Sequence, residues 1–313
     1  MEGGSLLRAV LVNRYEFIAD RMLTELADQH GDRLLTKVRV ADALDLDHMQ
    51  DVPASVKSYG LSAHLDFLMV EVATSLPKFA VELDGRQHWS DSRVQRRDAM
   101  KDTLCQRAGL PLLRITSDFL RQAGKWNLLD YVVDVYYRAE GFLEAQENGY
   151  IRGDEPFYHG LFLDRDVDGS LIFDTLDAPV IRRLWDYHHT GRLMNPLPDI
   201  VVTKVPAIRA VQGHSFLAVA EDRFLFAKVR VRDFLFFGIA PSDLALELAF
   251  VGIGHLVDDW LNDPDAAVAM NATRLAREAE EVQRALDEGH LLVSAGGNGL
   301  KGGGPGTPTI RVR

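Results

Sequence analysis

The sequence predicts an α/β (α+β) protein in which a mixed sheet is flanked by helices and a second α+β domain follows. Apolar residues make up 47% of the 313 residues and charged residues 26%, which is typical of a folded globular protein. Stretches with the three-and-four spacing of a helix lie between runs that alternate apolar and polar residues as strands do. The order helix, strands, helix, strand, helix over about the first 145 residues indicates a mixed sheet with helices against its faces.

The first predicted helix spans about residues 13–29. Its apolar residues lie three and four positions apart, as expected for a helix with one buried face, and Gly31 is a suitable C-terminal stop. Three predicted strands follow in residues 34–44, 64–72 and 78–85. Only a short turn separates the last two strands, so we expect them to form a hairpin.

A second helix is predicted from Asp91 to Ala108 and ends at Gly109. The strand that follows, "LPLLRI", carries a proline at its start, where the missing N–H does least harm. A third helix is predicted near residues 127–145. These elements complete the predicted first domain, residues 1–150.

A polar stretch with glycine and proline around residues 149–156 marks a candidate domain boundary. We expect an α+β domain of unknown role in residues 151–294 and a flexible glycine-rich tail in residues 295–313. The second domain is predicted to contain a hairpin in residues 160–174, a helix near 180–188, strands in 199–205, 215–222 and 223–231, and helices over Asp243–Trp260 and Asp265–Glu288.

Composition and charge narrow the classes of function. A lone cysteine, no signal-peptide pattern and no apolar run of about 18 residues predict a cytoplasmic protein that does not span a membrane. The net charge of -11 argues against an indiscriminate nucleic-acid binder, because an acidic surface repels phosphate. However, residues 86–125 carry nine basic and four acidic side chains, a local net charge of +5. The negative charge therefore lies mostly outside that segment.

Three carboxylates are expected to meet where two predicted strands end. Glu82 and Asp84, in "FAVELDGRQHW", point to one face because side chains two apart on a strand do so, and Asp66 on the neighbouring strand can join them. Carboxylate oxygens are the ligands that Mg²⁺ prefers, and such an ion can activate water beside a phosphate. The alternative is that Asp66 and Asp84 only terminate strands.

A basic stripe is predicted on the helix that follows. Arg93, Arg97 and Lys101 recur every four residues and so lie along one side of it. An acidic metal site beside a cationic stripe suits a phosphodiester substrate. The alternative is an ordinary solvated helix face.

Several motifs resemble the PD-(D/E)XK nuclease superfamily. They are "HLDFLMV", "FAVELDGRQHW" and "RRDAMKDTLCQRAGLPLLRI", together with "YEFIADRML" in the first helix. The resemblance is strongest to a bacterial uncharacterised-domain branch with an ELDG-x-x-H motif, similar to very-short-patch-repair endonucleases. It covers residues 13–140, a little under half of the chain, and implies a restriction-endonuclease-like sheet.

The resemblance implies roles for individual residues. Asp66 and Glu82 correspond to the metal-binding pair of the superfamily, and Glu16 to a helix-one glutamate that supports the metal. The superfamily usually has a lysine where this chain has Asp84, and Lys101 on the next helix is the expected replacement for that lysine. Asp84 would then add a third carboxylate to the metal site or orient its water.

Two further residues leave alternatives open. His88 can act as a general acid, contact phosphate, or pack against Trp89. Arg114, at the end of its strand, can bind phosphate in a nucleic acid or form a structural ion pair with Glu71 or Asp118.

The function that these features predict is a metal-dependent endonuclease using Mg²⁺ or Mn²⁺. DNA is the preferred substrate, RNA remains an alternative, and the resemblance implies a bacterial setting in DNA repair or in defence against foreign DNA such as phage. The second domain is expected to bind a protein partner, the substrate, or a second copy of the chain. The rival interpretation is a catalytically inactive nuclease-fold protein that binds nucleic acid or protein.

Overall fold

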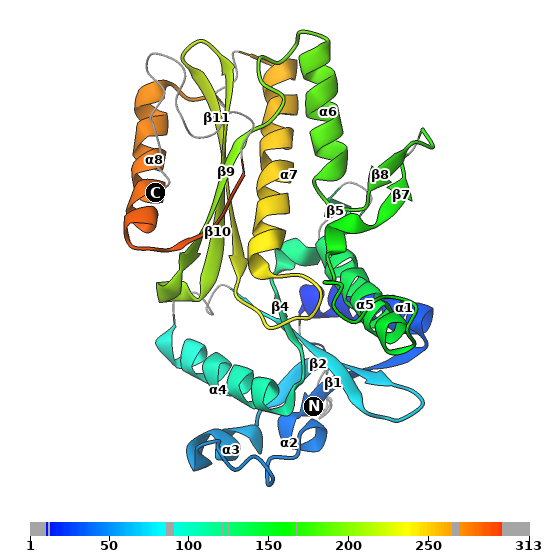
Figure 1. Ribbon diagram of the computed structural model, residues 1–313. Helices are drawn as coiled ribbons and strands as arrows, with labels where there is room; N and C mark the ends of the chain where they lie inside the picture. Colours follow the sequence, from blue (N-terminus) through cyan, green and yellow to red (C-terminus); the bar gives the residue numbers. More distant parts are fainter. Residues whose placement is uncertain are drawn as a thin grey trace, which may run out of the picture. The chain divides into compact units, whose positions relative to one another are not determined.

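The protein forms two compact units, and its helices and sheets are of the mixed α+β class that the sequence predicts (Figure 1). The computed structural model describes residue 11 and residues 13–85, 91–120, 122–123, 126–166, 168–264 and 269–295. Unit 1 comprises Met1–Glu155 and the segment Phe234–Gly238, and unit 2 comprises Pro156–Asp233 and Ile239–Arg313. The predicted boundary, after residue 150, lies close to the boundary between the units at residue 155.

The sheet of unit 1 has the strand order β1-β2-β3-β4. The first three strands pair antiparallel, and β4 pairs parallel to β3. The antiparallel β2–β3 pair is the hairpin expected from the sequence. The four strands are β1 (Asp32–Arg39), β2 (His64–Glu71), β3 (Pro77–Leu83) and β4 (Leu112–Ile115).

Local capping explains where the main helices of unit 1 begin and end. Asn13 caps the start of α1 by accepting the backbone N–H groups of Tyr15 and Glu16, and Gly31 ends this helix with a φ of 71°. Gly109 ends α4 in the same left-handed conformation, with a φ of 70°. The helices are α1 (Arg14–His30), α2 (Val40–Ala43), α3 (Ala54–Gly60), α4 (Ser92–Ala108) and α5 (Leu128–Glu147).

Helices cover both faces of the unit 1 sheet. Ala80 on β3 lies in a buried cluster with Leu104 and Cys105 of α4. The next side chain back, Phe79, contacts the ring of Tyr136 on α5, with ring centroids 4.8 Å apart. Because neighbouring side chains of a strand point to opposite faces, α4 and α5 lie on opposite sides of the sheet.

A distant segment completes this core. The segment Phe234–Gly238 lies in the second half of the sequence but belongs to unit 1. The backbone N–H of Leu112 donates to the carbonyl oxygen of Leu235 at 2.7 Å. Phe236 contacts Phe79 with ring centroids 5.3 Å apart. The sequence instead predicts that this segment belongs to the second domain, residues 151–294.

Unit 2 is built on an antiparallel sheet with the order β11-β10-β9-β12. Leu217 on β10 packs in a core with α6 and α7, whereas its neighbour Phe216 packs with α8, so these helices cover opposite faces (Figure 1). The elements are β7 (Leu163–Arg165), β8 (Leu171–Phe173), α6 (Ala178–His189), β9 (Asp199–Val205), β10 (Ala210–Ala220), β11 (Arg223–Arg232), α7 (Pro241–Asn262), α8 (Ala272–Asp287) and β12 (Leu291–Ala295).

Some predicted elements differ from the observed ones. The strand predicted over residues 34–44 ends at Arg39, and Val40 begins the short helix α2 because its side chain joins the α4 core. Neither α3 nor β12 was predicted, since both are short and lack a clear apolar period. The structure describes no tail residue after Ala295. Within the described residues, no helix has the length and apolar content that crossing a membrane requires.

Asp177, the residue before α6, is expected to destabilise the folded state at neutral pH. Burial raises the pKa of this carboxyl to about 6 from the 3.8 of an ordinary aspartate, so ionising it costs free energy that the unfolded chain does not spend. The cost grows between those two pH values and is constant above them. Asp177→Asn should therefore raise the free energy of unfolding by about 2–3 kcal/mol at pH 7.5 and by about half as much at pH 5. Urea titrations at both pH values measure this. Asp186→Asn, at an exposed position of α6, is the control, and an equal gain from both variants would contradict the prediction.

Candidate active site

Three acidic side chains and two lysines from five elements form one linked group in unit 1. We call it the carboxylate–lysine cluster. Its members are Glu16 of α1, Lys37 of β1, Asp66 of β2, Glu82 of β3 and Lys101 of α4.

Asp66 and Glu82 lie side by side because of the strand register. Phe67 pairs with Val81, which places Asp66 directly opposite Glu82 in the hairpin. Glu82 Oε1 accepts the backbone N–H of Asp66 at 3.1 Å, and Asp66 Oδ2 accepts the N–H of Leu83 at 3.0 Å. Each carboxylate is therefore held by the backbone of the neighbouring strand. The structure brings together the pair that the sequence nominated.

Lys101 reaches this pair from the helix on the sheet. Its Nζ lies 2.5 Å from Glu82 Oε2 and 2.7 Å from the carbonyl oxygen of His64. Burial alone would lower the pKa of Lys101, but the attraction of Glu82 outweighs it and raises the pKa. Lys101 thus keeps its proton. Burial raises the pKa of Glu82, an effect that the charge of Lys101 opposes.

Lys37 is a member of the cluster that the sequence analysis missed. It follows Thr36, which pairs with Phe67, so its backbone lies beside that of Asp66 on the neighbouring strand. Its Nζ lies 2.7 Å from Asp66 Oδ1 and 3.1 Å from Glu16 Oε1. Burial, the largest single effect, would lower the pKa of Lys37. The contacts with Asp66 and Glu16 together outweigh it, so the pKa is raised.

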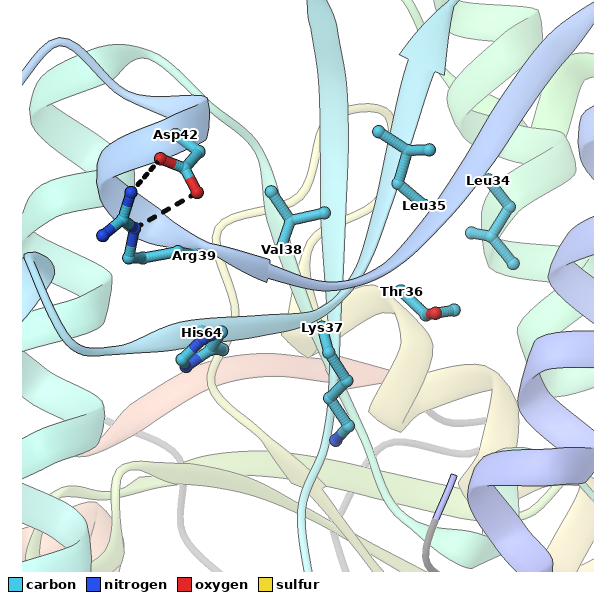
Figure 2. A pocket seen from close by; sticks show the side chains of 8 residues that line it. All are labelled: Leu34, Leu35, Thr36, Lys37, Val38, Arg39, Asp42 and His64. Atoms are coloured by element: carbon cyan, nitrogen blue, oxygen red, sulfur yellow. Dashed lines mark hydrogen bonds and ion pairs between the residues drawn. The ribbon is translucent and has the colours of Figure 1, made fainter. Parts of the chain in front are cut away.

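The backbone of Lys37 is strained. Its φ of 54° lies in the left-handed region, which is uncommon for a residue with a Cβ and is rare within a strand. In Figure 2 its side chain points to the opposite side of β1 from Leu35, which regular alternation would place on the same side. Such strain persists where surrounding contacts hold it, here the two carboxylates. An alternating sequence carries no signal of this reversal.

Asp84 does not join the cluster, which corrects the expected third metal ligand. Its Oδ1 accepts from Arg114 Nη1 at 3.0 Å, and the side chains of both residues are 1% exposed. Arg114 also lies 3.5 Å from Asp98 and 2.8 Å from Asp102. The arginine stands opposite Glu82 in the parallel β3–β4 register, so its guanidinium reaches the carboxylate just past the end of β3.

Arg114 is therefore not positioned to contact nucleic acid. Burial would lower its pKa, but Asp84 and the two other nearby aspartates raise it further, so the charge is permanent. The alternative of a structural ion pair describes this residue, although its partners are neither Glu71 nor Asp118.

The predicted basic stripe on α4 is interrupted. Arg93 and Arg97 are exposed, whereas Lys101 is buried with the helix face that packs against the sheet. The two arginines remain accessible to a polyanion, whereas the ammonium of Lys101 is directed into the sheet at Glu82. His88 lies outside the described residues.

An open groove of about 740 Å³ runs along β1 and includes Lys37 (Figure 2). Its other charged or titratable side chains are Arg39, Asp42 and His64, and Arg39 Nη2 lies 2.6 Å from Asp42 Oδ1. The same His64 supplies the carbonyl that holds Lys101. Of the cluster's members, Lys37 lines this groove, which follows the edge strand of the sheet.

Comparison with known proteins identifies one region of the chain. Residues 10–125 match a family described as "Protein of unknown function (DUF2726)". The match covers less than half of the chain and includes every member of the carboxylate–lysine cluster. No curated protein and no solved structure matches the chain significantly.

The side chains of the DUF2726-matching region can be compared with the ligands that a metal ion requires. In the described part of the chain, no group of three or more His, Cys, Asp or Glu side chains is arranged to hold one. Asp66 and Glu82 remain as an adjacent carboxylate pair. Mg²⁺ is commonly held by one or two carboxylates, with water and substrate phosphate completing its shell, so this pair fits such an ion.

Proposed function

We propose that unit 1 is a metal-dependent endonuclease that hydrolyses phosphodiester bonds, with DNA as the preferred substrate and Mg²⁺ or Mn²⁺ as the cofactor. One observation carries this proposal. Lys101, displaced onto α4, places its Nζ against Glu82 beside Asp66. A lysine that pointed into bulk solvent would instead have favoured an inactive protein.

The cluster supplies the groups that phosphodiester hydrolysis requires. Asp66 and Glu82 would hold the ion, which when bound lowers the pKa of water and offsets charge on the phosphate oxygens. An ammonium group has three N–H donors, and Lys101 uses two of them on Glu82 and His64. Within the described residues its third donor can orient the attacking water and stabilise the negative charge that develops on the phosphate.

Lys37 and the groove contribute to binding. The ammonium of Lys37 lies beside Asp66 and lines the groove, so it can bind a phosphate oxygen next to the reacting one. Glu16 accepts from Lys37 and keeps it pointing inward. Exposed Arg93 and Arg97 can add attraction for the nucleic-acid backbone. The repair or defence setting, and the partner of the second domain, rest on the resemblance alone.

Cleavage assays test the proposal directly. Purified full-length protein is incubated with supercoiled plasmid, single-stranded DNA or RNA in the presence of Mg²⁺ or Mn²⁺, and EDTA should stop cleavage. Asp66→Asn and Glu82→Gln should each lower the rate by about 100-fold or more, because either change removes a charged ligand. Asp45→Asn is the matched control, since this exposed aspartate pairs with His48 and lies outside the cluster. Cleavage that survives both cluster substitutions would overturn the proposal.

A non-catalytic nucleic-acid binding protein is the second candidate. It is favoured by the loss of Asp84 to Arg114, which leaves the metal site with fewer carboxylates than expected. In that case the protein would bind DNA with a dissociation constant unaffected by EDTA, would cleave no substrate, and would bind more weakly after Lys37→Ala. Fluorescence anisotropy with labelled DNA separates the two functions.

A further inference from the structure

Unit 2 contains a pocket of about 550 Å³ that the nuclease proposal does not use. It is lined by strand β8, the 3-10 turn His159–Leu161 and the first turns of α6 and α7. Its volume lies within the range of sites for small molecules.

Large apolar side chains line this pocket and remain exposed. Tyr158, Leu161, Leu171 and Phe173 are all more than half exposed. Side chains of this kind gathered around one cavity mark a binding site more often than ordinary surface. They provide an apolar contact area for a ligand.

The polar lining is acidic. Asp177, Asp243 and Glu247 all line the pocket, and Glu247 Oε1 lies 2.6 Å from His159 Nε2. Its other oxygen accepts the backbone N–H of Leu176 at 3.2 Å, which fixes the carboxylate in place.

The one arginine of the lining is engaged elsewhere. Arg182 lies 2.9 Å from Asp166 and 2.5 Å from Asp168, neither of which lines the pocket. Apart from His159, no other basic side chain lines the pocket in the described part of the chain. The pocket therefore presents three carboxylates, of which Glu247 is paired with His159 and Asp177 and Asp243 remain for a ligand to approach.

The burial of Asp177 and Asp243 also indicates that the pocket favours a cation. It raises the pKa of Asp177 to about 6 and also raises the pKa of Asp243. For Asp177 the neighbouring charge of Glu247 adds to this effect, while Thr175 and His159 oppose it. A cation entering the pocket would stabilise both carboxylates in their charged form.

We propose that this pocket binds a small organic cation, a protonated amine carried on an apolar body. The ammonium group would lie between Asp177 and Asp243, and the apolar body would contact Leu171 and Phe173. Charge complementarity selects the amine over an acid or an alcohol of the same shape, and the pocket volume of about 550 Å³ suits a small molecule. This inference concerns unit 2 alone and does not depend on nuclease activity.

A matched series of ligands tests the proposal. Isothermal titration calorimetry of the full chain at pH 7.5 compares 4-phenylbutylamine, 4-phenylbutanol and 4-phenylbutyrate, which share one apolar body. The amine should bind at least tenfold more tightly than the alcohol, and the acid most weakly. Asp243→Asn should weaken amine binding about tenfold and leave alcohol binding unchanged.

Two controls keep the result interpretable. Asp186→Asn, on an exposed part of α6 outside the pocket, should bind the amine like the unchanged protein. Circular dichroism and melting temperature establish that each variant is folded, and Asp177→Asn provides a second variant if Asp243→Asn is not. Equal affinity for amine and alcohol, tighter binding of the acid, or full amine affinity in the folded Asp243→Asn variant would each overturn the proposal.

Discussion

Arg114→Met is expected to destabilise unit 1 by about 3–5 kcal/mol, because removing one partner of a buried ion pair leaves uncompensated charge. The Arg114 guanidinium is the shared partner of Asp84, Asp98 and Asp102, and its side chain is only 1% exposed. Methionine fills similar volume but supplies no donor. The three carboxylates would then repel one another in a place that water reaches poorly.

Urea unfolding followed by circular dichroism measures this loss. Arg107→Met is the matched control, since Arg107 pairs with Asp51 at 2.7 Å but both side chains are about half exposed or more. Exposed pairs contribute about 0–1 kcal/mol, so this variant should remain close to the unchanged protein. A loss below about 1 kcal/mol for Arg114→Met would show that these aspartates do not depend on the arginine.

The contrast between Asp66 and Asp84 shows how far sequence reasoning extends to this site. Asp66 and Glu82 could be placed together from the sequence, because β2 and β3 are recognisable strands and the short turn between them fixes how they pair. The position of Asp84 depends on Arg114, which lies on a strand reached only after a whole helix. The spacing of residues within β3 could not reveal that Arg114 would bind Asp84.

Lys37 and the segment Phe234–Gly238 could not be predicted from the sequence for a second reason, which is that their positions depend on distant parts of the chain. The reversal at Lys37 follows from contacts with two other elements, and alternation along β1 predicts the opposite face. The segment joins a core built almost entirely from the first half of the chain. Helix ends, by contrast, were predictable from residues such as Gly31 and Gly109, because the left-handed cap favours glycine locally.

Lys101→Met is expected to lower the rate of DNA cleavage by about 100-fold or more, with substrate affinity nearly unchanged. This prediction rests on the proposed function. The lost ammonium is the donor held at Glu82 by a 2.5 Å contact, and it would be needed most when charge develops on the phosphate. Lys37→Met should instead weaken DNA binding, because Lys37 lines the groove. Initial rates over a range of DNA concentrations separate the two effects.

A second readout of Lys101→Met does not require nuclease activity. Without the lysine, burial and the charge of Asp66 both raise the pKa of Glu82 further, and nothing from α4 opposes them. When folding raises the pKa of a carboxyl, the folded protein loses stability as the pH rises above the pKa that the group has in the unfolded chain. The variant should therefore become less stable relative to the unchanged protein between pH 5 and pH 8, and Lys101→Arg should restore much of that loss. If stability has the same pH dependence with and without Lys101, the lysine does not control the charge of Glu82, and its place in the catalytic proposal fails as well.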